Sequence, residues 1–165
     1  MTSIRRLSQA DLPEYTALLR SGLAAHPDCF RIGPGDTQDP PQVGGTEEHF
    51  TLGAFSDGGG LVGIVSFARE TQTKMRHKGL LFRMHVTAEA SGQGVGRKLI
   101  RDCVGLVRAL PGLEAITLTV VASNAGARHL YASEGFVPFA REPNALKMGD
   151  TYYDEEQMRL DLRDV

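Results

Sequence analysis

Hydrophobic side chains recur along this chain with two periods, which predict a mixture of helices and strands. Apolar residues at helical spacing between Leu12 and Leu23 predict a first helix. Ser8 and Asp11 are spaced to form a capping box at its start. Alternating or β-branched apolar stretches predict strands in the rest of the chain. We expect these strands at 4–7, 50–55, 61–68, 78–86, 115–121, 136–140 and 157–162.

Two further helices are predicted in the second half of the chain. After Gly94 the apolar positions fall on one helical stripe, which Pro111 ends. Asn124 is a suitable N-cap for a shorter helix that stops at Gly135. The glycine-rich turn at 57–60 predicts that the strands before and after it, 50–55 and 61–68, form an antiparallel hairpin. The order of elements predicts an α+β fold: a mixed, mostly antiparallel sheet with helices on both faces.

The chain length fits one domain, which we assign to the whole range 1–165. The segment 26–45 is rich in proline, glycine and aspartate and shows little periodicity, so we expect a long loop, with a short helix near 46–49. Long loops in compact domains are commonly functional, and we interpret this one as a substrate-side loop or lid.

Composition narrows the class of protein. The formal net charge is -2, which gives no field that would favour nucleic acid or a membrane surface as a partner. Cys29 and Cys103 form no C-x-x-C pair, so we expect no metal, and Cys103 should pack in the core. The first residues lack an apolar signal segment, and no apolar run approaches the roughly 20 residues that span a bilayer. We therefore expect a cytoplasmic protein.

The strongest chemical signal is a glycine-rich turn between the predicted strand at 78–86 and the following helix. Gly92, Gly94 and Gly96 allow the backbone to approach a ligand closely. The free N–H groups of a helix start carry partial positive charge, and Arg97 adds a full one. Phosphate or pyrophosphate is the natural ligand of such a turn.

Other phosphate motifs fit this turn less well. A P-loop needs Gly-Lys followed by Ser or Thr, but Gly96 is followed by Arg97 and Lys98. A dinucleotide fingerprint needs glycine at position 97 and a βαβ unit near the start of a parallel sheet. A ligand-free glycine turn remains an alternative while this motif is considered alone.

Two motifs together resemble the GNAT superfamily of N-acetyltransferases. Residues 91–96 read Ser-Gly-Gln-Gly-Val-Gly and resemble its motif A, Q/R-x-x-G-x-G/A, with Ser91 at the Gln/Arg position. The second half matches the pattern N-x-x-A-x-x-L-Y-x-x-x-G-F at Asn124, Ala127, Leu130, Tyr131, Gly135 and Phe136. Residues 152–160 resemble the closing strand, so the resemblance extends from about 4 to 162.

The resemblance implies the GNAT fold, acetyl-CoA as co-substrate and direct transfer of the acetyl group to an amine. In the family, the strand before motif A separates from its neighbour at a bulge and pairs with the pantetheine arm of CoA. The implied cofactor-binding residues are Met84, His85, Val86, Ser91, Gly92, Gln93, Gly94, Val95, Gly96, Arg97, Asn124 and Ala127.

Tyr131 stands where the family places its general acid, and a phenol can donate a proton to the departing CoA thiolate. Simple packing between helix and sheet is the alternative for this residue. The general base stays open, because the family position for a carboxylate falls on Leu80. The candidates are His85, His49, Glu48, Glu70, Glu155 or an ordered water. The resemblance also puts Phe30 and Arg31 beside the acceptor.

We therefore interpret the chain as an N-acetyltransferase that acts on a primary amine of a small molecule or peptide. The alternative is a catalytically silent module that senses CoA or acetyl-CoA. Ser91 and Leu80 depart from the family pattern and favour that alternative, whereas Tyr131 argues against it. The acceptor stays open, as does a homodimer, which is common in the family.

Overall fold

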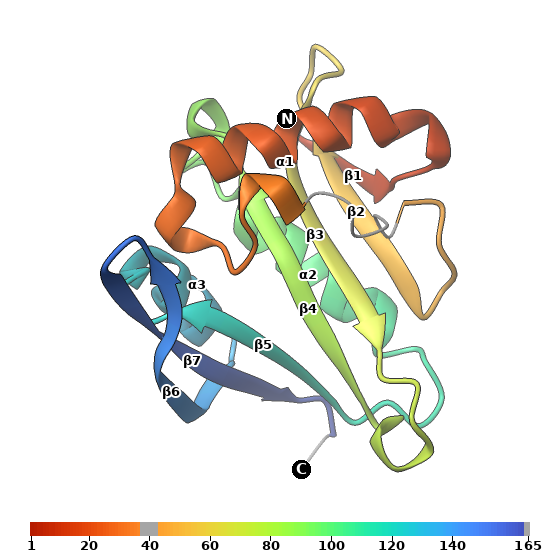
Figure 1. Ribbon diagram of the computed structural model, residues 1–165. Helices are drawn as coiled ribbons and strands as arrows, with labels where there is room; N and C mark the ends of the chain where they lie inside the picture. Colours follow the sequence, from red (N-terminus) through yellow and green to blue (C-terminus); the bar gives the residue numbers. More distant parts are fainter. Residues whose placement is uncertain (37–42, 164–165) are drawn as a thin grey trace.

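The computed structural model describes residues 1–36 and 43–163. Its described strands form one sheet of seven, in the order β1-β2-β3-β4-β5-β7-β6 (Figure 1). The strands are β1 (Ser3–Arg6), β2 (His49–Phe55), β3 (Leu61–Arg69), β4 (Lys78–Val86), β5 (Ala115–Val121), β6 (Val137–Met148) and β7 (Thr151–Asp161). Strands β4 and β5 are parallel, and every other pair in this sheet is antiparallel.

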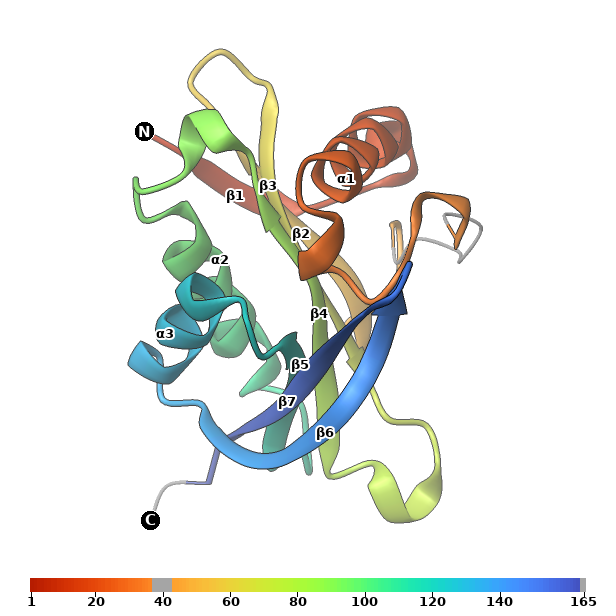
Figure 2. The ribbon, with the colours of Figure 1, turned by 60° about the vertical axis from the view of Figure 1, so that its left-hand side comes forward.

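Helices cover both faces of the sheet, which confirms the predicted α+β architecture. Helix α1 (Leu12–Ala25) lies on one face against β3 and β4. Helices α2 (Val95–Val107) and α3 (Ala125–Ser133) lie on the other face, as Figure 2 shows. The sheet is therefore the middle layer of three.

Each face of the sheet has its own apolar core. Ile64 of β3 packs in the α1 layer, whereas Val65 and Phe67 pack in the opposite layer, and all three are 0% exposed. This division follows from the period-2 alternation of side chains along a strand. Cys103 of α2 is also fully buried, as predicted, and burial raises the pKa of its thiol to about 12.

The capping box predicted before α1 is present and is held by an arginine of β1. The Asp11 carboxylate accepts a bond of 2.7 Å from the Ser8 backbone N–H. Arg5 donates to both Asp11 oxygens at 2.8 Å, which lowers the pKa of that carboxyl. The ion pair fixes the start of α1 against the first strand.

Some expectations were wrong. The residues 46–49 form no helix, because Thr46 and His49 make an isolated β-bridge and His49 begins β2. Strands β6 and β7 extend well beyond 136–140 and 157–162. The added lengths are polar and mostly exposed, so they carry no hydrophobic alternation that would reveal them. The middle of the predicted lid, 37–42, lies outside the described residues.

The feature that positions the site is the separation of β4 from β5. The parallel register joins Lys78–Leu80 to Ala115–Thr117 and goes no further. Beyond it, Arg83 adopts a φ of 50° and the register with β3 shifts, which is a β-bulge. A bulge bends its strand, so the end of β4 leads away from β5.

The glycine at the closed end of this pair offers a test of the packing. An added Cβ at Gly79 would lie 2.4 Å from the ring of Phe67, which is fully buried. We expect Gly79→Ala to lower the free energy of unfolding by about 1–3 kcal/mol through overpacking.

The matched control is Gly105→Ala in the last turn of α2, where an added Cβ meets no atom within 4 Å. Because alanine is the better helix former, this change should stabilise the protein by up to about 1 kcal/mol. Urea unfolding of both variants measures the difference, and equal effects would contradict the packing argument.

Candidate functional site

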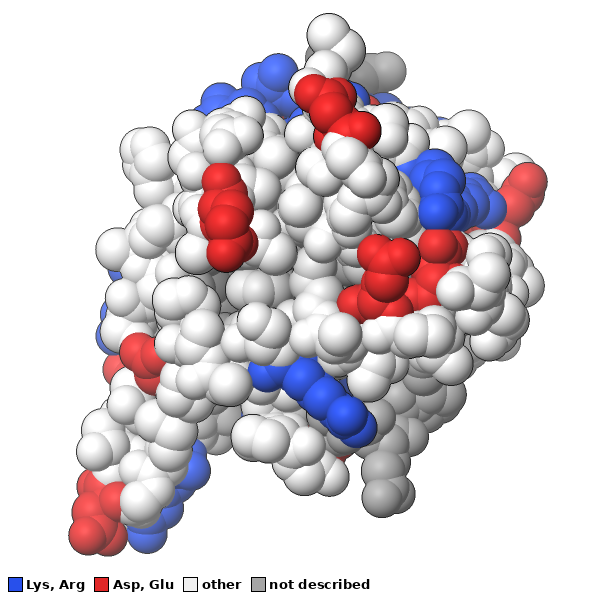
Figure 3. All heavy atoms as spheres, turned by 90° about the horizontal axis from the view of Figure 1, so that it is seen from above, with Lys and Arg blue, Asp and Glu red and all other residues white. Residues whose placement is uncertain are grey.

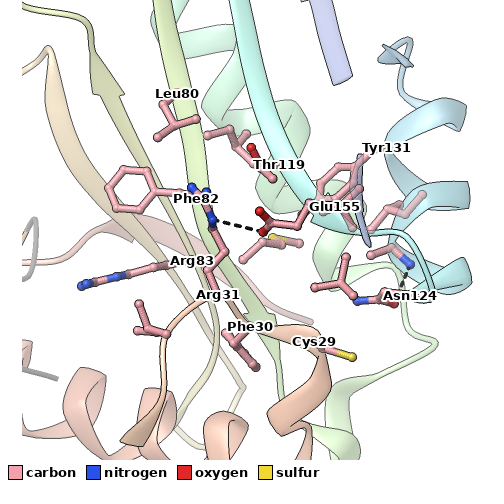
Figure 4. Close-up of a pocket in the computed structure, with 17 residues that line it drawn as sticks. Cys29, Phe30, Arg31, Leu80, Phe82, Arg83, Thr119, Asn124, Tyr131 and Glu155 are labelled. Carbon is pink, nitrogen blue, oxygen red and sulfur yellow. Dashed lines mark hydrogen bonds and ion pairs between the residues drawn. The ribbon is translucent and has the colours of Figure 1, made fainter. Parts of the chain in front are cut away.

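A cavity opens where β4 and β5 separate, and we call it the central cavity (Figure 4). Its volume is about 280 Å³. Both strands line it, together with the segment 29–32, helix α3 and one residue of β7. The labelled side chains of Thr119, Tyr131 and Glu155 lie around it in Figure 4.

A second cavity of about 560 Å³ adjoins the first on the side of the glycine turn, and we call it the glycine-turn cavity. Phe30, Met84, Asn124 and Ala127 line both cavities, so the two are continuous. Every predicted cofactor-binding residue except Gln93 lines the glycine-turn cavity. The Gln93 side chain instead donates to the Glu89 carbonyl at 2.9 Å.

The three glycines of the turn have two different structural roles. Gly92 and Gly94 have φ angles of 77° and 80°, which few other residues adopt, and an added Cβ at either meets no atom within 4 Å. At Gly96 an added Cβ would lie 3.0 Å from Met84 Cε. The first two glycines therefore leave open space before the start of α2, and the third allows α2 to pack closely on β4.

The arginine next to these glycines, Arg97, contacts residues at the end of helix α3. Arg97 donates to Ser133 Oγ at 3.1 Å and lies 3.3 Å from Glu134. Arg101 also pairs with Glu134, at 2.8 Å. The side-chain charge expected at the turn is thus partly compensated, which leaves the backbone N–H groups of α2 as the main positive feature.

Helix α3 brings Tyr131 to the central cavity. The Asn124 side chain accepts from the Ala127 N–H at 3.2 Å and caps the helix, as predicted. Tyr131 is 7% exposed, and its ring meets Phe136 edge-on at 5.9 Å. Burial raises the pKa of this phenol, so the hydroxyl is protonated at neutral pH. Tyr131 therefore both packs against the sheet and lines the cavity.

Glu155 of β7, one of the candidate bases named from the sequence, lies at the central cavity. Its side chain is only 2% exposed and lines the central cavity. Its Oε2 lies 3.1 Å from Arg31 Nε, but among the described residues this oxygen has no hydrogen-bond donor in suitable geometry. Burial raises the pKa of the carboxyl, and the nearby Arg31 opposes that shift.

Of the other candidate bases, Glu48 lies elsewhere and is occupied. It binds Arg69 at 3.0 Å and Arg76 at 2.9 Å, as part of the structure around β3. His85 does line the glycine-turn cavity, and burial lowers the pKa of its imidazole. Its ring packs between Phe30 and Gly22, where an added Cβ would lie 2.7 Å from Nε2.

The segment around Phe30 and Arg31 separates the central cavity from a third one. That cavity measures about 150 Å³ and is bounded on its far side by the β6–β7 hairpin, including Tyr153. Phe30, Arg31 and Ile32 line both. Of the two residues expected beside the acceptor, Arg31 lines the central and third cavities, whereas Phe30 lines all three.

On the face seen from above (Figure 3), charge is not concentrated in one patch. In Figure 3, acidic and basic side chains are interspersed on a mostly uncharged face. Among the described residues, no helix combines the length and apolarity needed to cross a membrane. Across 1–36 and 43–163, no group of three or more His, Cys, Asp or Glu side chains is placed to hold a metal.

Solved structures of acetyltransferases share this fold. A GNAT-family acetyltransferase from Streptococcus pneumoniae superposes with a TM-score of 0.84 at 24% identity, over 98% of this chain and 99% of that one. For yncA, a putative acetyltransferase from Salmonella typhimurium solved with its cofactor acetyl-CoA, the TM-score is 0.80 at 19% identity, over 100% of this chain and 96% of that one. For an N-acetyltransferase from Staphylococcus aureus Mu50, the TM-score is 0.74 at 21% identity, over 98% of each chain.

The sequence itself places the chain in a family. The model of the Acetyltransferase (GNAT) family matches residues 15–136, and this protein belongs to that family. Among curated proteins, none matches the sequence. The family is one of acyltransferases, and its fold is the one described above.

The buried carboxylate predicts an unusual response of stability to mutation. Because the pKa of Glu155 is raised on folding, its ionised form destabilises the folded state once the pH exceeds the unfolded pKa of about 4.3. We expect Glu155→Gln to raise the melting temperature at pH 7, with a gain that vanishes as the pH is lowered to about 4.

Glu156, the next residue, is the control. It pairs with Arg128 at 3.2 Å, so Glu156→Gln should lower the melting temperature at pH 7 instead. Thermal unfolding across this pH range compares the two variants. A pH-independent effect of Glu155→Gln would contradict the description of Glu155 as a buried carboxylate with a raised pKa.

Proposed function

We propose that this protein transfers the acetyl group of acetyl-CoA directly to a primary amine of a small molecule or peptide. Both substrates bind together, and Tyr131 acts as the general acid. The observation that supports this best is the continuous pair of cavities, with the glycine turn at one end and Tyr131 at the other. The bound acetyl-CoA of the structurally similar yncA supports the same co-substrate.

The residues present suit a CoA molecule. The open space before Gly92 and Gly94 accommodates a diphosphate, which the N–H groups at the start of α2 bind. The stretch Met84–Val86 lines the same cavity and offers its backbone to the pantetheine arm. Ser91 replaces a longer polar side chain at one edge, so the backbone carries more of the diphosphate binding.

Acetyl-CoA supplies an activated acyl group in the form of a thioester. An alkyl amine with a pKa near 10.4 is protonated at pH 7, and exposing its lone pair costs about 4.6 kcal/mol. The backbone N–H near Val86 is suited to polarise the thioester carbonyl. Tyr131, protonated and buried beside the cavity, gives its proton to the departing sulfur.

Replacing Tyr131 by phenylalanine tests this role. We expect a decrease of between about 100- and 10,000-fold in thiol release from acetyl-CoA, measured across a panel of amines. Affinity for CoA, measured by calorimetry, should not change, because the hydroxyl is needed only when the sulfur departs. Tyr152→Phe is the matched control, since Tyr152 is 52% exposed.

The same experiments distinguish the proposed acetyltransferase from a module that only senses CoA or acetyl-CoA. If the folded protein binds CoA but releases no thiol with any amine, the alternative of a CoA-sensing module is favoured. If calorimetry detects no binding of CoA or acetyl-CoA, both are excluded.

A further inference from the structure

We infer that Glu155 receives the acceptor: its buried carboxylate binds the substrate ammonium and takes its proton, while Arg31 is the counterion that the ammonium displaces. This inference rests on the proposed function and extends it by naming the general base and the charge of the acceptor. The observations that carry it are the burial of the carboxylate, the lack of a hydrogen bond to its Oε2 among the described residues, and its place on the central cavity.

The carboxylate is built into the sheet and is not simply left on its surface. In β7, Glu155 and Glu156 point to opposite faces because side chains alternate along a strand. Glu156 is bound by Arg128 through both carboxylate oxygens, at 3.3 and 3.2 Å. Glu155 Oε2 has no such hydrogen bond among the described residues, although it is fully shielded from solvent. A buried oxygen of this kind is costly unless a ligand satisfies it.

Arg31 is suited to be displaced. Its side chain is 63% exposed, whereas that of Glu155 is 2% exposed. Its Nε lies 3.1 Å from Glu155 Oε2 but not in hydrogen-bond geometry, and Figure 4 shows the arginine reaching the carboxylate from the segment 29–32. An exposed guanidinium loses little when it returns to water. The arginine therefore neutralises the carboxylate at rest and leaves when a substrate cation arrives.

The location fits the geometry that acyl transfer requires. The glycine-turn cavity shares Met84 and Asn124 with the central cavity, and the third cavity shares Arg31 and Ile32 with it. Glu155 and Tyr131 line only the central cavity. CoA reaches this space from the glycine turn, so the acceptor approaches from the side of Arg31. The substrate ammonium then meets Glu155 beside the thioester.

The protons and electrons balance with these two residues. The Glu155 carboxylate takes one proton from the ammonium, and the freed lone pair forms the new C–N bond to the acetyl carbon. The C–S bond breaks, and the sulfur leaves with its electron pair and takes the Tyr131 proton. The second proton lost by nitrogen restores Tyr131, directly or through water, and Glu155 releases its proton to solvent.

The groups that face Glu155 favour this role near neutral pH. Arg31 belongs to the segment 29–32, and Glu142 lies opposite Glu155 in the β6–β7 register. Tyr131 of α3 and Thr119 of β5 also line the cavity, as does Arg83 of β4, whose guanidinium donates to the Tyr15 hydroxyl at 3.0 Å. Burial and Glu142 raise the pKa of the Glu155 carboxyl, and Arg31 lowers it. A carboxylate with a raised pKa is a better proton acceptor than an ordinary glutamate.

Kinetics with two amines of different basicity test proton transfer. With n-butylamine at pH 7, Glu155→Gln should lower kcat/KM at least about 100-fold and remove the acidic limb of the pH profile. With O-methylhydroxylamine, which is unprotonated at pH 7, the loss should be less than about tenfold. Glu156→Gln should leave both rates near those of the unmodified protein. Equal losses with both amines would overturn the role as proton acceptor.

Carboxyl NMR tests binding without any turnover. In protein labelled with ¹³C at the glutamate carboxyls and saturated with CoA, the Glu155 resonance is identified by its absence in Glu155→Gln. We expect n-butylammonium to shift it saturably and tetramethylammonium, which has no N–H donor, to leave it in place. Arg31→Ala should strengthen the response, because the competing cation is gone.

These outcomes separate the inference from the function on which it rests. If CoA binds but n-butylammonium leaves the Glu155 resonance unchanged, the inference is wrong and the proposed function stands. If CoA does not bind, the proposed function is itself refuted and the inference falls with it.

Discussion

The site depends on a parallel pairing that is cut short. Strands β4 and β5 are joined only from Lys78 to Leu80, after which each keeps a different neighbour. Strand β4 stays on β3 as far as Val86, and β5 stays on β7 as far as Val121. Had the two remained paired, the middle of the sheet would be closed. The bulge at Arg83 and the tight packing at Gly79 hold this divergence in place.

The space between the separated strands, made up of the glycine-turn cavity and the central cavity, carries opposite charge at its two ends. At one end the first turn of α2 presents backbone N–H groups, and the neighbouring guanidinium of Arg97 is partly compensated by Glu134. At the other end a buried carboxylate is countered by an exposed arginine. In the proposed reaction, the phosphates of the donor bind at the first end and the ammonium of the acceptor binds at the second, which is the arrangement that direct transfer needs.

Two buried charged side chains, Arg69 and Glu155, differ in how far their hydrogen bonds are satisfied. Arg69 is 6% exposed, and its guanidinium donates to Glu48 and to the carbonyls of Arg76 and Pro111. Those bonds tie β3 to the loops at the end of the sheet away from the site. Glu155 is as deeply buried, yet one of its oxygens has no hydrogen bond among the described residues. The first charge is satisfied and stabilises the fold, while the second lies at the central cavity, where we propose that it binds the acceptor.

The sequence by itself determined the helices, the central strands and the glycine turn, because hydrophobic period and glycine placement are local signals. It also placed Asn124 and Tyr131 on their helix through motif spacing. It could not show the full lengths of β6 and β7, whose polar residues lack alternation. It named Glu155 only as one of several candidate bases and could not show that this side chain faces the cavity. Which of two adjacent glutamates faces the cavity depends on strand register against β5 and β6, and only the tertiary structure sets that register.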